Sequence, residues 1–123
     1  MQSNSTKPYL IRALHEWCTD NNYEPYILVK TDDTTIVPRL YIKNGEITLN
    51  ISIDATAKLQ IKNDAITFQA NFNNTIENIF IPMANIIAIY SPVTGIGMEF
   101  TFSKANNDSN LENIKSKQFS IVK

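Results

Sequence analysis

The chain has 123 residues, of which 43% are hydrophobic and 19% are charged, and its formal net charge is -1. This composition is typical of a single globular domain and excludes a wholly disordered chain. The near balance of 11 basic and 12 acidic residues argues against nonspecific nucleic-acid binding, which needs a clustered excess of Lys and Arg.

Nothing in the sequence indicates export or a membrane. Cys18 is the single cysteine, so no intramolecular disulfide can form. Residues 1–7 are polar and lack the apolar core of a signal peptide. The longest apolar run, residues 86–90, is far too short to cross a bilayer. We therefore expect a cytoplasmic protein that has no membrane partner.

Residues 8–20 are predicted to form an N-terminal helix, because Pro8 is tolerated in a first turn. Leu10, Leu14 and Trp17 recur at helical spacing and form one apolar stripe. Four further apolar side chains widen the stripe: Tyr9, Ile11, Ala13 and Cys18. Such a wide stripe fits a well-buried helix, or a helix that packs both on its own domain and on a second copy.

From residue 26 onward the hydrophobic pattern changes to period two, which predicts strands. The predicted strands cover residues 26–30, 36–43, 46–53, 59–61, 65–72, 75–81, 86–90 and 97–102, with a break at residues 82–85. The strongest hairpin signal is Asn44-Gly45. It predicts that Lys43 faces Glu46, with the pairs Ile42–Ile47 and Leu40–Leu49 beyond them. One helix followed by short antiparallel strands indicates a small barrel or sandwich.

The sequence offers little for catalysis. His15 and Cys18 stand three residues apart on the helix, but no second pair of ligands completes a metal site. A reactive cysteine would also need an electropositive pocket. Asp32-Asp33 reads as a turn. We therefore expect no catalytic residue, metal or cofactor, and a function in binding.

Five segments in chain order resemble the stringent starvation protein B family. They are residues 8–17 (PYLIRALHEW), 45–51 (GEITLNI), 63–72 (NDAITFQANF), 81–90 (IPMANIIAIY) and 95–100 (GIGMEF). The resemblance implies a fold that is mainly β with one N-terminal α-helix, specifically a small Sm-like antiparallel β-barrel. It also implies a homodimer formed through the helix stripe of Leu10, Leu14 and Trp17.

The resemblance further implies an adaptor and not an enzyme. Family members bind the ssrA tag, which the transfer-messenger RNA system adds to stalled nascent chains, and they also bind some untagged substrates. They tether these substrates to the ClpXP protease and so enhance degradation. The positions that match the tag groove are Gln69, Ala70, Asn71, Phe72, Met98 and Phe100. Met98 and Phe100 match the apolar part that receives the tag's aromatic residue.

The alternative is an Sm-like RNA-binding protein, in which Trp17, Phe68 and Phe72 would stack on bases. The flat charge balance makes nucleic acid an unlikely partner, and core packing is the simpler role for these aromatic residues.

The expected domain organisation has three parts. Residues 1–102 form the helix and barrel, residues 103–118 a polar linker, and residues 119–123 a docking peptide. Phe119, Ser120, Ile121, Val122 and Lys123 resemble the family peptide that docks on the N-terminal zinc-binding domain of the ClpX ATPase; a frayed end is the alternative. Family tails are often longer and more acidic. A flexible linker of this length spans roughly 20–25 Å on average.

Overall fold

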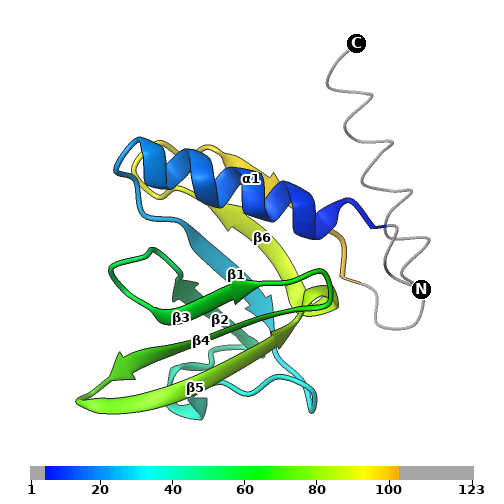
Figure 1. Ribbon diagram of the computed structural model, residues 1–123. Coiled ribbons are helices and arrows are strands. Elements are labelled where there is room, and N and C mark those ends of the chain that lie inside the picture. The colour runs from blue at the N-terminus through cyan, green and yellow to red at the C-terminus, as the bar shows by residue number, and fades with distance from the viewer. Residues whose placement is uncertain (1–4, 103–123) are drawn as a thin grey trace.

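The computed structural model describes residues 5–102, which fold into one helix and two antiparallel sheets (Figure 1). The elements are α1 (Lys7–Asp20), β1 (Tyr26–Lys30), the 3-10 turn η2 (Arg39–Tyr41), β2 (Glu46–Asn50), β3 (Ala57–Ile61), β4 (Ala65–Phe72), β5 (Thr75–Pro82), the 3-10 turn η3 (Met83–Asn85), β6 (Ile86–Tyr90) and β7 (Gly97–Glu99). The predicted helix is confirmed, and the predicted break at residues 82–85 contains η3.

The strands pair in two groups. One sheet has the order β2-β1-β6-β7 and the other has the order β3-β4-β5. Every pairing between named strands is antiparallel. The mainly β fold with one helix is therefore confirmed. Within residues 5–102 the strand pairings do not close into a barrel, so the Sm-like barrel is not confirmed.

The core lies between the two sheets and beneath α1. It joins Ile27 and Val29 of β1 to Ile66 of β4 and Ile81 of β5, and all four side chains are fully buried. Ile11 enters the same core from the helix with no exposed surface. Figure 1 shows α1 lying along β6, with β3 beneath it. The helix contacts both strands and so bridges the sheets.

The tight turns follow from residues that tolerate positive φ. Asn44 and Gly45 have φ of 54° and 76°, and Asn73 and Asn74 have φ of 57° and 68°. A two-residue hairpin turn requires this region, which Gly and Asn enter at low cost. The turn predicted at Asn44-Gly45 is confirmed, and the predicted pairing of Lys43 with Glu46 is present as an isolated bridge.

The predicted strand at residues 36–43 is wrong. This segment contains η2, and its only strand-like pairings are isolated bridges at its two ends. Leu40, expected opposite Leu49, is 87% exposed. Leu49 instead pairs with Ile27 of β1. Two segments compete to pair with β2. The strand β1 offers a long run of buried partners, whereas the segment at residues 36–43 contains Pro38, which has no backbone N–H to donate to a strand pairing.

The last predicted strand is shorter than expected. The strand was predicted to cover residues 97–102, but β7 ends at Glu99. One further backbone bond, from Phe100 N to Ile87 O at 2.9 Å, continues the contact with β6. No helix within residues 5–102 is long and apolar enough to span a membrane.

Candidate functional site

The small side chain of Ala70 opens a pocket in the β3-β4-β5 sheet. Ala70 is half-buried near the C-terminal end of β4 and pairs with Glu77 of β5. Its neighbours Gln69 and Asn71 line the same pocket, which has a volume of about 220 Å³. The structure therefore brings together three of the six predicted tag-binding residues.

The opposite wall of this pocket is the segment that leads into β3. It consists of Asp54, Ala55, Thr56 and Ala57. The segment is held in place by Ser52, whose carbonyl oxygen accepts the Thr56 hydroxyl at 2.9 Å. The Ser52 hydroxyl in turn accepts the Ala55 backbone N–H at 3.2 Å. Local bonds of this kind fix a turn without help from a ladder.

Alanines line both sides of the pocket. Ala55 and Ala57 belong to the segment that leads into β3 and Ala70 belongs to β4, and Ile76 of β5 adds the one large apolar side chain of the lining. Such an arrangement leaves room for the backbone and short side chains of an extended peptide, which is the usual form of a groove that selects by size. The lining contains one charged residue, Asp54.

Gln69 is oriented by a partner across the strands. Its side-chain Nε2 donates to Oδ1 of Asn78 at 2.9 Å. The two residues are register partners in the β4–β5 pairing. This bond uses one N–H of the Gln69 side chain, so its side-chain oxygen and the side-chain amide of the exposed Asn71 retain the capacity to bind a peptide.

Phe72 lies in a neighbouring pocket. This second pocket, of about 400 Å³, is lined by Phe72, Glu77 and the residues around η2. The Phe72 ring packs against the Tyr41 ring in a tilted arrangement, with centroids 5.3 Å apart and planes at 41°. Phe72 thus packs partly on the core and partly on η2, at the end of the strand that carries Ala70.

Met98 and Phe100 belong to the other sheet. Met98 is half-buried on β7, where it pairs with Ile89. Phe100 is 5% exposed and forms part of the core. Nζ of Lys7 lies 5.1 Å from the centroid of the Phe100 ring. The contact of these two residues with a bound peptide stays a prediction.

The predicted dimer stripe lies on one flank of α1. Leu10, Leu14 and Trp17 are half-buried, and the two leucines also pack on the core. The ring of Trp17 contacts Tyr23, with centroids 5.3 Å apart. The fully buried face of the helix is formed instead by Ile11 and its neighbours Lys7, Pro8 and Cys18. The stripe keeps exposed apolar surface, and its pairing with a second copy stays a prediction.

His15 and Cys18 have separate environments. His15 Nε2 donates to the carbonyl oxygen of Ile51 at 2.8 Å. Cys18 is 2% exposed, and burial raises the pKa of its thiol. A raised pKa is the opposite of what a nucleophilic thiolate requires. Within residues 5–102, no group of three or more His, Cys, Asp and Glu side chains is arranged to hold a metal ion.

Sequence reasoning missed the wall at residues 54–57 and Ile76. The only local signal for the wall was the run of small residues between two strands, Ala55-Thr56-Ala57. Nothing in that run indicates that it faces Ala70, because the approach depends on the pairing of Ala57 with Gln69. The linker at residues 103–118 and the docking residues 119–123 lie outside the described residues.

Two comparisons place the chain among known proteins. A family model described as "Stringent starvation protein B" matches residues 5–120. The stringent starvation protein B homolog of Haemophilus influenzae is 38% identical over 112 residues, which cover 90% of this chain and 75% of that relative. The matched residues include the helix, all the strands described above and the pocket at Ala70. The resemblance indicated by the sequence segments is confirmed.

Proposed function

Because the chain belongs to the stringent starvation protein B family, we propose that it is a non-enzymatic adaptor that holds ssrA-tagged polypeptides for the ClpXP protease. The observation that carries the proposal is the pocket of about 220 Å³ between Ala70 and residues 54–57. Its small walls and exposed amide groups suit an extended peptide, in which backbone bonds give affinity and side-chain pockets give selectivity.

In the proposed mechanism the adaptor acts by tethering. The pocket at Ala70 holds the tag, while residues 119–123 bind the N-terminal zinc-binding domain of ClpX. Linking the two events raises the effective substrate concentration near the protease to the millimolar range without any new contact. Dimerisation through Leu10, Leu14 and Trp17 would supply two tethers for each complex, in the cytoplasm where nascent chains are tagged.

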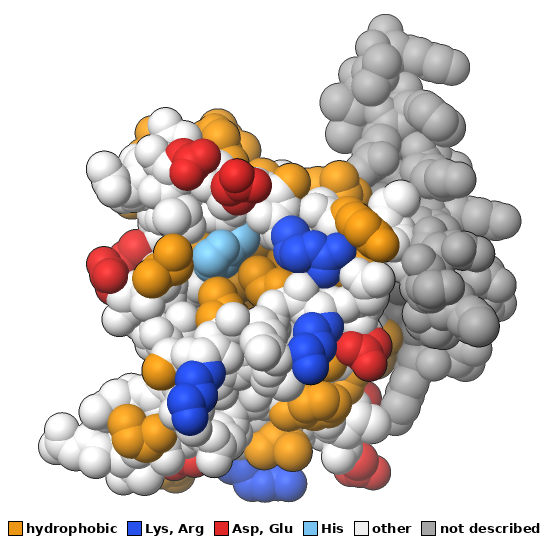
Figure 2. All heavy atoms as spheres, in the orientation of Figure 1, with side chains coloured by type: hydrophobic (Ala, Val, Ile, Leu, Met, Phe, Trp, Pro, Cys, Tyr) orange, Lys and Arg blue, Asp and Glu red, His pale blue; other side chains and the backbone are white. Residues whose placement is uncertain are grey.

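The charge distribution supports a peptide over RNA. On the face drawn in Figure 2, the Lys and Arg side chains stand apart from one another and form no continuous stripe. A protein that follows a phosphate backbone needs a continuous basic groove.

Peptide binding is tested by fluorescence polarisation with a labelled ssrA tag peptide. We expect Ala70→Gln to weaken binding at least tenfold, because the longer side chain would occupy the space that the peptide needs. Thr67→Gln is the matched control, since Thr67 is on the same strand but does not line the pocket. Absence of binding by the unmodified protein would overturn the proposed function.

Delivery is tested by degradation of a tagged substrate by ClpXP. Removal of residues 119–123 is expected to abolish the stimulation and leave tag binding unchanged. A chain that lacks residues 108–112 but keeps its last five residues controls for the change in length. Full stimulation by the truncated chain would show that the docking assignment is wrong.

A further inference from the structure

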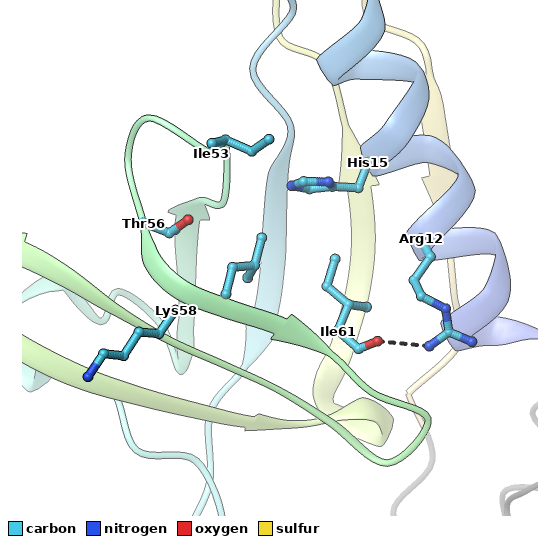
Figure 3. Close-up of a pocket in the computed structure, with 7 residues that line it drawn as sticks. Arg12, His15, Ile53, Thr56, Lys58 and Ile61 are labelled. Atoms are coloured by element: carbon cyan, nitrogen blue, oxygen red, sulfur yellow. Dashed lines mark hydrogen bonds between the residues drawn. The ribbon is translucent and has the colours of Figure 1, made fainter.

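The two edges of the β3-β4-β5 sheet differ in how they are protected. The helix α1 contacts β3, and the guanidinium of Arg12 donates to the carbonyl oxygen of Ile61 at 2.8 Å, as Figure 3 shows. A pocket of about 460 Å³ remains between the helix and this strand. The β3–β4 register also shifts between Ala57 and Gln60. Covers and irregularities of this kind keep an edge strand from pairing with another segment.

The opposite edge, formed by β5, is paired at one end only. The N–H of Ile36 donates to the carbonyl oxygen of Phe80 at 2.9 Å, and the N–H of Phe80 donates to the carbonyl oxygen of Ile36 at 3.0 Å. Backbone groups of successive residues in an antiparallel strand point alternately to its two sides, so those of Asn78 and Ile76 point to this same edge. Within residues 5–102 they have no backbone partner there.

Pro38 explains why the segment that contains Ile36 does not continue along β5. In the antiparallel direction it would place Pro38 opposite Asn78, where a strand needs an N–H donor that proline lacks. The chain forms η2 instead. A pocket of about 400 Å³ lies between the residues around η2 and β5, where Thr75 and Glu77 line it. The space beside this edge is therefore open to an added strand.

The side chains along the β5 edge are strongly apolar for an exposed position. Ile76, Asn78 and Phe80 share one face of the strand because they are two residues apart. Ile76 is 61% exposed and Phe80 is 38% exposed, and Ile36 beside Phe80 is 59% exposed. An exposed edge that combines free backbone groups with apolar side chains is a template for a further strand.

The C-terminal segment of the chain has the pattern and the charge that fit this edge. Residues 118–121 (QFSI) alternate polar and apolar side chains, which is typical of a half-exposed strand. Residues 113–123 contain three lysines and no acidic residue, whereas residues 5–102 contain seven basic and ten acidic residues. The segment and the folded domain therefore carry net charges of opposite sign, which favour their association.

The chain between the folded domain and this segment is long enough for the contact. Residues 103–117 can span up to about 50 Å when extended. A domain of about 100 residues has a radius of gyration of only about 13 Å. The segment can therefore reach β5 of its own chain.

We propose that residues 118–122 add to the free edge of β5 as a further strand of the same chain, with an apolar side chain beside Ile76. Backbone bonds to Ile76 and Asn78 hold the strand, as in other cases of strand addition. The strand addition is independent of the proposed function, but its consequence rests on that function: the residues assigned to ClpX docking are masked until ClpX displaces them. The apparent affinity for ClpX is then reduced in proportion to the fraction of chains whose segment is free.

The test is amide hydrogen exchange, read by NMR, in the unmodified chain and in a full-length variant that carries Phe119→Asp and Ile121→Asp. We expect the Ile76 and Asn78 amides to exchange about tenfold more slowly in the unmodified chain, because the added strand accepts their hydrogen bonds. Equal exchange of these two amides in both chains would overturn the proposal.

Two matched controls separate strand addition from a general change in stability. The amides of Glu77 and Ile79 point toward β4, so they should be protected equally in both chains. A full-length variant with Phe119→Val and Ile121→Val keeps the alternation and should keep the protection of Ile76. Protection that survives the aspartate changes and increases with protein concentration would assign the edge to a second copy, and the proposal would be overturned.

Asn78→Pro tests the edge itself. This change removes an N–H that points away from β4, a position at which an edge strand accepts proline. The protection of the Ile76 amide should be lost, and the variant should bind the isolated zinc-binding domain of ClpX about threefold more tightly than the unmodified chain. Unchanged protection of Ile76 would overturn the strand addition. If neither chain binds ClpX while Ile76 is protected as expected, the docking assignment alone is wrong and the strand addition stands.

Discussion

The two sheets differ in how much of their apolar surface they cover. In the β2-β1-β6-β7 sheet, Ile27, Val29 and Ile89 have no exposed surface. In the β3-β4-β5 sheet, Ile76 is 61% exposed and Phe80 is 38% exposed, and the pockets at Ala70 and between α1 and β3 border this sheet. Both sheets bury side chains in the shared core, among them Ile66 and Ile81 of the β3-β4-β5 sheet. The β3-β4-β5 sheet, called the open sheet below, also carries exposed apolar side chains beside the binding surfaces, whereas the β2-β1-β6-β7 sheet is called the closed sheet.

The largest predicted effect comes from truncating one isoleucine to alanine in each sheet, which tests this contrast directly. Ile27→Ala is expected to lower the free energy of unfolding by about 2–5 kcal/mol, because it leaves a cavity in a fully packed core. Ile76→Ala should cost less than about 0.5 kcal/mol, since its side chain is mostly in water. Denaturant unfolding with a far-ultraviolet dichroism signal measures both.

The same pair of variants should rank in the opposite order in tag binding. Ile76 lines the pocket at Ala70, so its truncation removes contact surface for the peptide, whereas folded Ile27→Ala keeps the pocket intact. Equal losses of stability in the two variants would show that the open sheet contributes as much packing as the closed one.

The parts of the fold that the sequence predicted correctly are those encoded locally. The helix α1 and the Asn44-Gly45 turn depend on residues close together in the chain. The misassigned segment, residues 36–43, has the same alternation as a strand, yet β2 pairs with β1. A period-two pattern shows that a segment can pair, but the choice of partner depends on the burial that each competitor offers.

The candidate site follows the same rule. Gln69, Ala70 and Asn71 were identified because they are consecutive and match the family pattern. The wall at residues 54–57 was missed because it reaches Ala70 only through the pairing of β3 with β4. Phe100 shows the limit in the other direction, since alternation predicts a buried side chain, which Phe100 has, but does not tell whether that side chain also borders a groove.

The next largest effect concerns Lys7, a basic side chain that is buried at the start of α1. Lys7 is 5% exposed, and its Nζ has no hydrogen-bond partner among the described residues. Burial lowers the pKa of Lys7 from 10.5 to about 8. Between these two pKa values the unfolded chain binds more protons than the folded one, so the free energy of unfolding rises with pH. Below pH 8 Lys7 is protonated in both states, and the full cost of burying its charge lowers the stability of the fold.

Lys7→Met should therefore raise the free energy of unfolding at pH 7 by about 1–3 kcal/mol and remove its rise above pH 8. Unfolding by denaturant across pH 7 to pH 10 measures the effect. Lys62→Met, at an exposed position, is the control and should keep the rise. Parallel pH curves for the unmodified protein and Lys7→Met would contradict the assignment.

The smallest predicted effect lies on the outer face of the open sheet. The bond between Gln69 and Asn78 is exposed, so Asn78→Ala should lower the free energy of unfolding by only about 0.5 kcal/mol. A double-mutant cycle with Gln69→Ala isolates the coupling between the two amides. Tag affinity should change about twofold, because Gln69 loses its orientation and keeps its place in the pocket. A coupling above about 1 kcal/mol would mean that this polar face stabilises the fold as much as a core contact, and the division between a closed supporting sheet and an open binding sheet would no longer hold.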